Sequence, residues 1–296
     1  MRFIVDTDPG HDDLIAIILT HDLAEITAVT TVSGNAPLRE TTVNSLVAAD
    51  LVGFDGPVVA GADRPRSREP AHAAAVHGET GLDGAPRPEP VRQLAGTDAA
   101  AAIVELADAD TWIAAIGPLT NVAAALDRDP DLAHRVAGIT VMGGAVAMGN
   151  VTAVAEFNVW ADPEAADIVF RSGARVVMCG LDLTTQVRYD EAWVDTITQP
   201  YVAALLRHYL ANHRYLEAAG APLHDPCAVL AVTHPELFEF TDHPVTVECA
   251  GELTRGMTVV DRRPWARDAN VSVAVTVDAP AALELVAGAI NRVGRR

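Results

Sequence analysis

The chain has 296 residues, half of them hydrophobic, with a formal net charge of −19 and no lysine. This length is enough to bury a large core. The acidic balance disfavours a protein that binds the nucleic-acid backbone, because such a protein needs a basic surface. No apolar run approaches the roughly 18 residues of a membrane-spanning helix, so we expect no contact with a membrane.

Up to residue 180, short apolar runs alternate with alanine-rich helical patterns. The predicted strands are 2–6, 26–32, 57–60, 111–116, 138–142 and 175–180. The predicted helices between them are 12–21, 38–52, 97–107, 119–127 and 163–171. Most of the strands read as nearly continuous apolar runs, which is typical of a sheet covered on both faces. We therefore expect an α/β fold with a mostly parallel, doubly wound (Rossmann-like) sheet flanked by helices.

Beyond residue 190 the pattern changes, although no linker forces a boundary, so we expect one domain over 1–296. Helices are predicted at 192–217, from 226 onward and at 280–293. Strands are predicted at 244–249, 257–260 and 271–277. The region 61–90 is rich in Pro, Gly and Arg and contains "HGETG", which indicates a long surface loop.

The three cysteines, Cys179, Cys227 and Cys249, form no CxxC pair. An odd number without such pairs disfavours a disulfide framework or a structural zinc site. The first predicted strand follows Met1 directly and leaves no room for a signal peptide. Both observations fit a reducing cytoplasm, and we expect the protein there.

Polar and glycine-rich residues gather where the predicted strands end. The first strand ends in "DTDPG", the second in "VSGN" with Asn35, and the fourth in "AIGPLTN". The fifth ends in "MGG" and the sixth in "CGLDLT" with Asp182. In open parallel sheets the ligand crevice lies at the carboxyl ends of the strands. The sequence therefore predicts a site at that edge.

The segment "DTDPGHDD" places four aspartates within eight positions: Asp6, Asp8, Asp12 and Asp13. Capping of the following helix would explain Asp12 and Asp13, which the helix dipole favours in a first turn, but it leaves the other two unexplained. Four neighbouring carboxylates need a counter-charge or must bind protons. A divalent cation supplies that charge, and ligands that are all hard oxygens suit Ca²⁺ or Mg²⁺ rather than Zn²⁺.

Two further segments carry polar residues in apolar surroundings. In "LHDPCAV", Asp225 before Pro226 reads either as a helix cap or as part of a second acidic site, and His224 reads either as a loop residue or as a functional one. In "GNVTAVAEFNVWADP" the polar residues are Asn150, Glu156 and Asn158. They suit recognition of hydroxyl groups or serve as turn residues. The glycines of "MGGAVAMGN" do not match a dinucleotide fingerprint.

Together these segments resemble the nucleoside hydrolase family, of the inosine–uridine preferring type. The segments "DTDPGHDD", "TTVSGN", "HGETG", "IGPLTN", "VMGG", "AEFN.WADPEAA", "GLDLT", "HDPCAV" and "LTRGMTVVD" occur in family order from Met1 to roughly residue 261. The resemblance implies Ca²⁺-dependent hydrolysis of the N-glycosidic bond of ribonucleosides, giving free base and ribose. It also implies a homodimer or homotetramer with a small-molecule ribonucleoside as substrate.

The resemblance also implies a role for each matching residue. The Ca²⁺ ligands would be the carboxylates of Asp8, Asp13 and Asp225 and the backbone carbonyl of Ile116. The substrate-binding set would comprise Asp12 and Asn158 at the ribose hydroxyls, Asn150 and Glu156 at the 5′-hydroxyl, Asn35 near the metal and its water, and His77 and Met142. Asp6 would support the loop.

In the reaction that the resemblance implies, Asp8 takes a proton from the metal-bound water. The ribose passes through an oxocarbenium-like transition state, which the carboxylates stabilise. His224 faces the base and protonates it as it leaves. One or more of four further residues would complete the base side, namely His208, Tyr209, His213 and Tyr215.

Three other functions compete with this one. A haloacid-dehalogenase-like phosphohydrolase also opens on a strand ending in DxD, but it normally needs a lysine, which this chain lacks. A non-catalytic Ca²⁺-binding protein would explain the acids but not the amides and Glu156. A member of the same family that acts on another N-ribosyl substrate is the third alternative.

Overall fold

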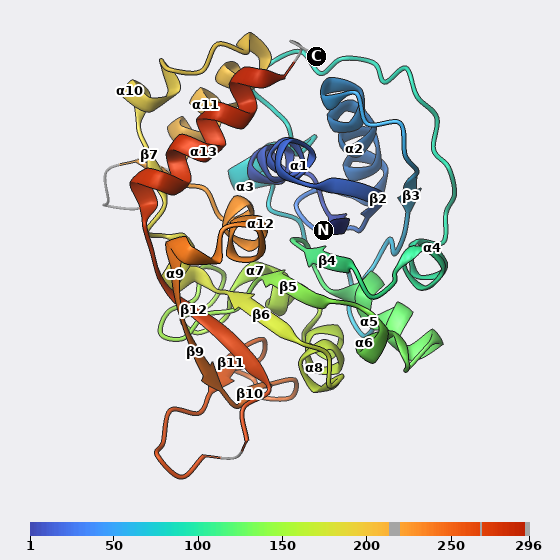
Figure 1. Cartoon of the computed structure of the whole chain (residues 1–296), viewed down its shortest axis with the longest axis vertical. Helices are drawn as coiled ribbons and strands as arrows, with labels where there is room; N and C mark the ends of the chain where they lie inside the picture. The colour runs from blue at the N-terminus through green and yellow to red at the C-terminus, as the bar shows by residue number, and fades with distance from the viewer. Residues whose placement is uncertain (213–219, 267, 294–296) are drawn as a thin grey trace.

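The computed structural model describes residues 1–212, 220–266 and 268–293, which build an eight-stranded sheet in the order β3-β2-β1-β4-β5-β6-β12-β9 (Figure 1). In that order the strands are Val58–Ala60, Glu25–Thr31, Arg2–Thr7, Thr111–Ala115, Gly138–Met142, Val176–Cys179, Val271–Val277 and Phe238–His243. Neighbouring strands are parallel except β9, which runs antiparallel to β12 at the edge.

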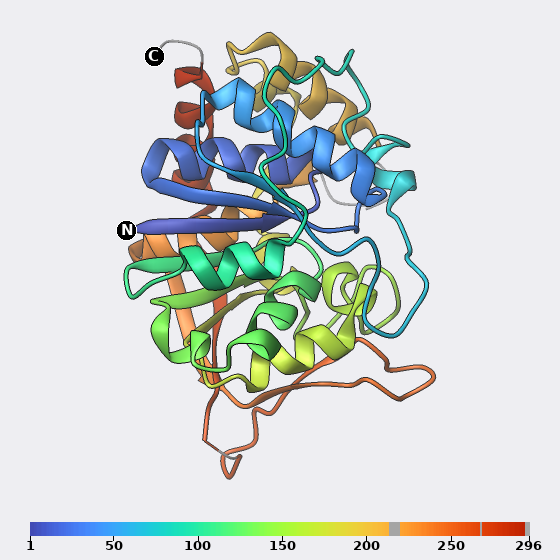
Figure 2. The same ribbon diagram turned by 90° about the vertical axis from the view of Figure 1, so that its right-hand side faces the viewer.

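Helices cover both faces of the sheet (Figure 2). One face carries α1 (His11–Leu23), α2 (Leu38–Val52), α11 (Pro200–Asn212), α12 (Asp225–Thr233) and α13 (Ala279–Arg292). The other carries α4 (Ala99–Leu106), α5 (Thr120–Arg128), α6 (Leu132–Arg135) and α8 (Pro163–Arg171). The predicted α/β, doubly wound architecture is therefore confirmed. No helix in the described ranges is long and apolar enough to cross a membrane.

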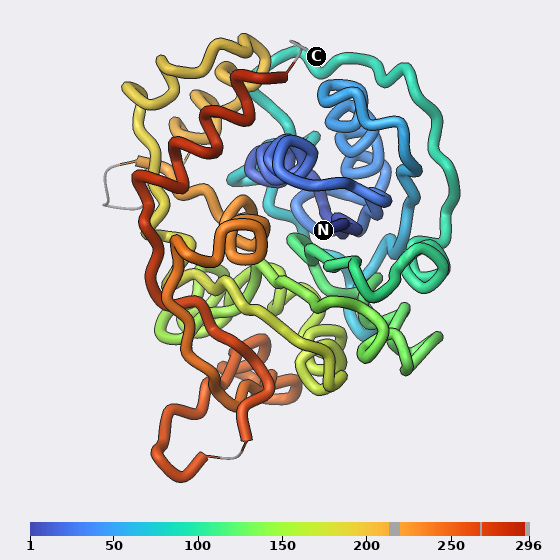
Figure 3. Tube along the Cα trace, in the orientation of Figure 1, coloured from blue at the N-terminus to red at the C-terminus, as the bar shows by residue number. Residues whose placement is uncertain are grey.

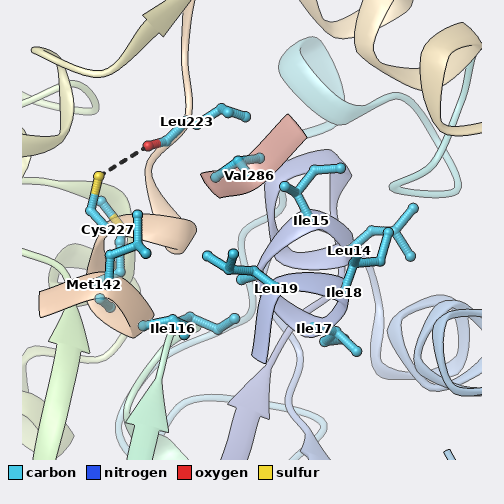
Figure 4. Close-up of a cluster of buried hydrophobic side chains, with 14 of the residues drawn as sticks. Leu14, Ile15, Ile17, Ile18, Leu19, Ile116, Met142, Leu223, Cys227 and Val286 are labelled. Carbon is cyan, nitrogen blue, oxygen red and sulfur yellow. Dashed lines mark hydrogen bonds between the residues drawn. The ribbon is translucent and has the colours of Figure 1, made fainter. Parts of the chain in front are cut away.

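The helix α1 is buried on all sides over most of its length, as its continuous apolar run from Leu14 to Leu19 requires. Every residue from His11 to Thr20 is buried. Figure 4 shows Leu14, Ile15, Ile17, Ile18 and Leu19 of this helix in one buried cluster with Ile116, which follows β4, Cys227 of α12 and Val286 of α13. A helix packed this completely holds its first turn, and the acidic residues on it, in a defined place.

Alternation along β1 separates its side chains between the two faces. Phe3 and Val5 lie in the core under α1, whereas Ile4 lies in the core under α5. Asp6 points to the same face of the sheet as Ile4, and its carboxylate accepts a hydrogen bond from the Asn121 side chain of α5. One strand thus delivers aspartates to two different environments.

The topology defines where a ligand crevice can form. From β1 the chain winds outward through β2 to β3, and from β4 it winds the opposite way through β5 to β6. The loops after β1 and β4 therefore diverge at a switch point, and ligands of such sheets bind there. Asp8 follows β1 and Ile116 follows β4 at this point.

The last third of the chain differs from the sequence expectation. The prediction of a single helix at 192–217 was wrong, because the structure has two helices there, α10 (Glu191–Val194) and α11. Pro200 cannot continue a helix but is well suited to start one. Residues 213–217 lie outside the described part. The strands β10 (Val245–Val247) and β11 (Thr258–Val260) form a separate antiparallel hairpin. The edge strand β9 was not predicted.

Short elements complete the chain: α3 (Ala74–His77), α7 (Phe157–Ala161), α9 (Leu181–Thr184), a 3-10 helix (Pro235–Leu237), and the paired strands β7 (Arg188–Tyr189) and β8 (Ala221–Pro222). Most of the region 61–90 is irregular, as predicted. Figure 3 shows the chain between α3 and α4 running around the outside of α2 and β3.

Candidate active site

Asp8 lies between the ends of three strands, and backbone encloses its carboxylate. The backbone N–H of Asn35 donates to Oδ2 at 2.6 Å. A Cβ on Gly117 would lie 2.5 Å from Oδ1, and a Cβ on Gly34 would overlap Oδ2. Oδ1 is buried and has no hydrogen-bond partner. A buried carboxylate oxygen without a partner is costly, and an oxygen placed in this way is suited to coordinate a cation.

Asp13 is the most completely hydrogen-bonded of the cluster. Its carboxylate accepts from the Thr7 hydroxyl at 2.5 Å and from the Gly10 N–H at 2.9 Å. It also accepts from the Asn35 amide at 3.1 Å and the Asp8 N–H at 3.2 Å. These bonds hold the carboxylate in one orientation at the first turn of α1, where a negative charge is favoured.

Asp12, Asp13 and Asp225 come together at the first turns of two helices. Each offers an oxygen, and these oxygens lie within 4.8 Å of one another. Asp225 opens α12, which packs against α1. The N–H of His224 donates to Oδ2 of Asp12 at 3.3 Å, which ties the two helix starts together. Three converging carboxylates are suited to hold a hard divalent cation. This group includes Asp12, which was predicted to bind ribose, and does not include Asp8, which was predicted as a metal ligand.

The electrostatics of the cluster point the same way. Burial, followed by the charge of Asp13, raises the pKa of Asp8 well above its usual range and that of Asp12 to about 7. Burial and the charge of Asp12 also raise the pKa of Asp225 well above its usual range. Ionisation of all these carboxyl groups together is unfavourable, because they are buried and each ionised carboxylate repels the next. A divalent cation would reverse that preference.

Glu156 and Asn158 form the second side of the site, at the ends of β4 and β5. The Asn158 amide donates to the carbonyl oxygens of Ile116 at 2.9 Å and Met142 at 3.0 Å. Glu156 caps α7 and accepts from the N–H of Gly144 at 2.8 Å and of Asn158 at 2.9 Å. Burial raises its pKa to about 7. The carbonyl predicted as a metal ligand thus lies beside the amide predicted to bind ribose.

A group of rings stands next to the acids. His11 stacks on His77, His208 and Tyr209, with ring centroids 5.5, 5.7 and 5.2 Å away. Burial, and next the charge of Asp12, raise the pKa of Tyr209 well above its usual range, so the rings adjoin the carboxylates. Of the four residues considered for the base side, His208 and Tyr209 belong to this group, while His213 and Tyr215 lie outside the described residues.

His224 is half-buried at the start of α12, and its Nδ1 shares a 2.7 Å hydrogen bond with the Thr184 hydroxyl. Its neighbour Asp225 belongs to the acidic cluster. The structure therefore brings His224 to the predicted site, although it lies more than 200 positions after Asp8 in the sequence.

Two predicted residues lie apart from this assembly. Asn150 is exposed in the loop before Glu156, so its assignment to the substrate stays a prediction. Asp6 accepts from the Thr30 hydroxyl at 2.6 Å and from Asn121 at 2.8 Å. Its carboxylate ties β1 to β2 and α5, which fits the supporting role expected of it.

The sequence did not reveal His11, Thr7 or Thr184 as contributors. His11 lies inside "DTDPGHDD", but nothing local indicates that residue 77 packs on it. Thr7 precedes Asp8, and alternation alone would place its hydroxyl on the α1 side. Thr184 ends "GLDLT", one of the segments at the ends of the strands, and this location was the one sequence feature that could have indicated a role in the site. Asp182 in the same segment accepts from the N–H of Ala147 and holds the loop after β5.

Comparison with known proteins adds independent findings. A profile of the family described as inosine-uridine preferring nucleoside hydrolase matches residues 3–284. The pyrimidine-specific ribonucleoside hydrolase RihA of Shewanella woodyi is 41% identical over 307 residues, covering 99% of this chain and 98% of the relative. RihA of an Enterobacter species is 40% identical over 302 residues, covering 97% and 96%.

Solved structures agree over the same length. The purine-preferring ribonucleoside hydrolase from Gardnerella vaginalis superposes with a TM-score of 0.91 at 30% identity, covering 98% of both chains. An inosine-guanosine nucleoside hydrolase superposes with a TM-score of 0.88 at 28% identity, covering 99% of both chains.

Proposed function

Because the chain belongs to the inosine-uridine preferring nucleoside hydrolase family, we propose that it is a Ca²⁺-dependent hydrolase of pyrimidine ribonucleosides. The resemblance read from the sequence motifs is confirmed, and with it the class of ribonucleoside hydrolase. The pyrimidine preference rests on the relatives at 40–42% identity, which are named pyrimidine-specific. The purine-preferring structure is more distant, at 30% identity.

The cluster of buried aspartates carries the metal proposal. Asp8, Asp13 and Asp225 would hold Ca²⁺ together with the carbonyl of Ile116, and Asp12 would face the sugar. The buried Oδ1 of Asp8 without a partner supports this assignment. The hard-oxygen donor set suits Ca²⁺. When bound, the ion supplies Lewis acidity that polarises a water and orients it against the sugar.

Asp8 takes one proton from the attacking water, whose oxygen bonds to the anomeric carbon as the N-glycosidic bond breaks. Asp12 and Asn158 hold the ribose hydroxyls. Glu156 and Asn150 bind the 5′-hydroxyl, and Asn35 orients the water. Positive charge that develops on the ribose is stabilised by the carboxylates around it.

The leaving base must gain a proton, and His224 supplies it. The Thr184 hydroxyl on Nδ1 holds the imidazole ring in one orientation, which is the positioning that a general acid requires. His77 and Tyr209 flank the base from the α3 and α11 side, in the ring group beside Asp12. Met142 closes the bottom of the site next to Asn158.

A reducing-sugar assay on uridine, cytidine, inosine and guanosine tests the proposal. We expect ribose from uridine and cytidine, slower release from the purines, and loss of activity on chelation with recovery by Ca²⁺. Absence of ribose from all four nucleosides would refute the function. Release of ribose from other N-ribosyl compounds alone would support the alternative of a family member that acts on another N-ribosyl substrate. Equal purine and pyrimidine rates would refute the preference.

We also propose a homodimer or homotetramer in the cytoplasm. Trp265 and Leu253 are 77% and 83% exposed in the segments around β11, which project from the body (Figure 1). Large exposed apolar side chains favour an interface. The three cysteines carry free thiols, as a reducing compartment would leave them. Light scattering on the purified protein tests the assembly, and a monomer at micromolar concentration would refute it.

A further inference from the structure

Asn44 is a polar residue in the middle of α2, and it is completely buried. Asparagine is a weak helix former, and a buried amide is costly unless its hydrogen bonds are made. Its Nδ2 donates to the carbonyl oxygen of Pro9 at 2.8 Å and to that of Thr80 at 2.8 Å. Its Oδ1 accepts from Nη1 of Arg87 at 2.8 Å. Both N–H groups of the amide and its oxygen are therefore used.

These partners define the orientation of the Asn44 amide. A carbonyl oxygen can only accept and a guanidinium group can only donate, so Nδ2 must face the two carbonyls and Oδ1 must face Arg87. Arg87 is held in turn by Glu40, whose carboxylate oxygen lies 2.8 Å from its Nη2. The amide cannot turn over without losing all three hydrogen bonds. Asn44 is thus a fixed donor to the backbone of the acidic segment.

The carbonyl of Pro9 belongs to the same peptide group as the N–H of Gly10. That N–H donates to Oδ2 of Asp13 at 2.9 Å. Because a peptide group is planar, its carbonyl and its N–H turn together, and a donor that fixes the carbonyl also directs the N–H. Glycine would permit other orientations of this peptide group at little cost. The hydrogen bond from Asn44 selects the one in which the N–H meets Asp13.

We propose that Asn44 is a positioning residue for the metal site. By fixing the peptide group between Pro9 and Gly10, it holds the carboxylate of Asp13 in the orientation in which it converges with Asp12 and Asp225. This inference rests on the proposed function, because it assumes that Asp13 is a metal ligand. Partners that orient a ligand typically contribute tenfold to a hundredfold in metal affinity. Asn44 acts through one intervening peptide group, so we expect the lower end of that range.

The second N–H of Asn44 joins the loop "HGETG" to the same turn. Gly81 has φ +84°, and a Cβ there would lie 2.9 Å from the carbonyl oxygen of Pro9 and 3.0 Å from Nδ2 of Asn44. A Cβ on Gly10 would lie 2.7 Å from Cε1 of His77, so the loop packs on the turn at a second point. One buried amide therefore holds together α2, the acidic turn and a loop that is distant from both in the sequence.

Asn44→Leu tests the proposal, because leucine is similar in size and uncharged but donates no hydrogen bond. Calorimetric titration of the metal-free variant with Ca²⁺, under conditions in which it is fully folded, should give a dissociation constant about tenfold or more above that of the wild type. Asn270→Leu is the matched control. Nδ2 of Asn270 also donates to two backbone carbonyls, those of Phe170 at 2.8 Å and Val245 at 3.0 Å, between α8 and β10. This variant should bind Ca²⁺ as the wild type does.

An unchanged dissociation constant in Asn44→Leu would overturn the proposal. An equal loss of affinity in Asn270→Leu would overturn it as well, because Asn44 would then act only through the general stability of the fold. A wild type that neither binds Ca²⁺ nor releases ribose from uridine would instead refute the proposed function.

Amide hydrogen exchange, followed by NMR, tests the orientation in the metal-free wild type. If Asn44 fixes the peptide group without the ion, the Gly10 N–H should exchange slowly, as a hydrogen-bonded amide does. In Asn44→Leu it should exchange about tenfold faster or more, and an unchanged rate would contradict the proposal. A Gly10 N–H that exchanges in the wild type as fast as an unprotected amide would overturn the inference even if Asn44→Leu does not fold.

Discussion

Raising the pH should destabilise the metal-free protein through Asp12. The pKa of this buried carboxyl is about 7 in the folded chain, against 3.8 as its ordinary value. Folding therefore retains a proton that the unfolded chain releases. The associated stability is fully present below the ordinary pKa and is lost as the pH rises through 7. The difference corresponds to roughly 4 kcal/mol, fully expressed by pH 8.

Asp12→Asn removes this titration while keeping the size of the side chain. Without metal, the variant should be more stable than the wild type at pH 8 by about 4 kcal/mol, with the gain shrinking toward pH 4. Free energies of unfolding from urea titrations at the two pH values, in the presence of a chelator, measure the effect. Glu105→Gln, on the exposed side of α4, keeps Asp12 and is the control; it should lose stability between pH 4 and pH 8 as the wild type does.

Added Ca²⁺ should stabilise the wild type more at pH 8 than at pH 5, because protons compete for the same oxygens. At 100 times its dissociation constant, the ion would add about 2.7 kcal/mol. If the wild type and Asp12→Asn differ by the same free energy at both pH values, the electrostatic account of the cluster is wrong. Equal stabilisation by Ca²⁺ at pH 5 and pH 8 would contradict it as well.

Thr184→Val should lower kcat on uridine about tenfold but spare a nitrophenyl riboside, because the ring of His224 loses its partner; equal losses on both would remove His224 as the acid. Gly34→Ala should lose Ca²⁺-dependent stabilisation, since its methyl would overlap the carboxylate of Asp8; calorimetric binding of Ca²⁺ unchanged from the wild type would contradict this. Asp6→Asn should be more stable than the wild type at pH 8 but not at pH 4, because burial raises the pKa of Asp6 to about 7. Urea titrations at the two pH values check this, and no gain at pH 8 would refute it.

The sheet was readable from the sequence because its central strands are short apolar runs with clear ends. The predicted bounds of β1, β2, β4, β5 and β6 agree with the structure to within one residue. The antiparallel edge strand β9 was not predicted, because its sequence, "FEFTDH", is not a continuous apolar run. It alternates polar and apolar residues after a helix, and no turn signal marks its ends clearly. The order of the strands also depends on contacts between distant segments, which no local pattern encodes.

The same division holds for the site. Asp12, Asp13 and Asp225 were readable as acids in the first turns of helices, and the structure brings them together. The packing of His77 on Gly10 was not readable, because it depends on where a loop of irregular structure lands. Local pattern indicates which residues carry chemistry, whereas tertiary packing decides which of them share a pocket.

The winding of the sheet also affects how the protein is made. Asp8 and Asp13 leave the ribosome about a hundred residues before the strand beside them, β4, and Asp225 on α12 follows much later still. A nascent chain therefore carries an incomplete acidic cluster through most of its synthesis. If the aspartates hold Ca²⁺ as proposed, tight binding should appear only after α12 has emerged, and the ion would then stabilise the finished fold without guiding its early steps.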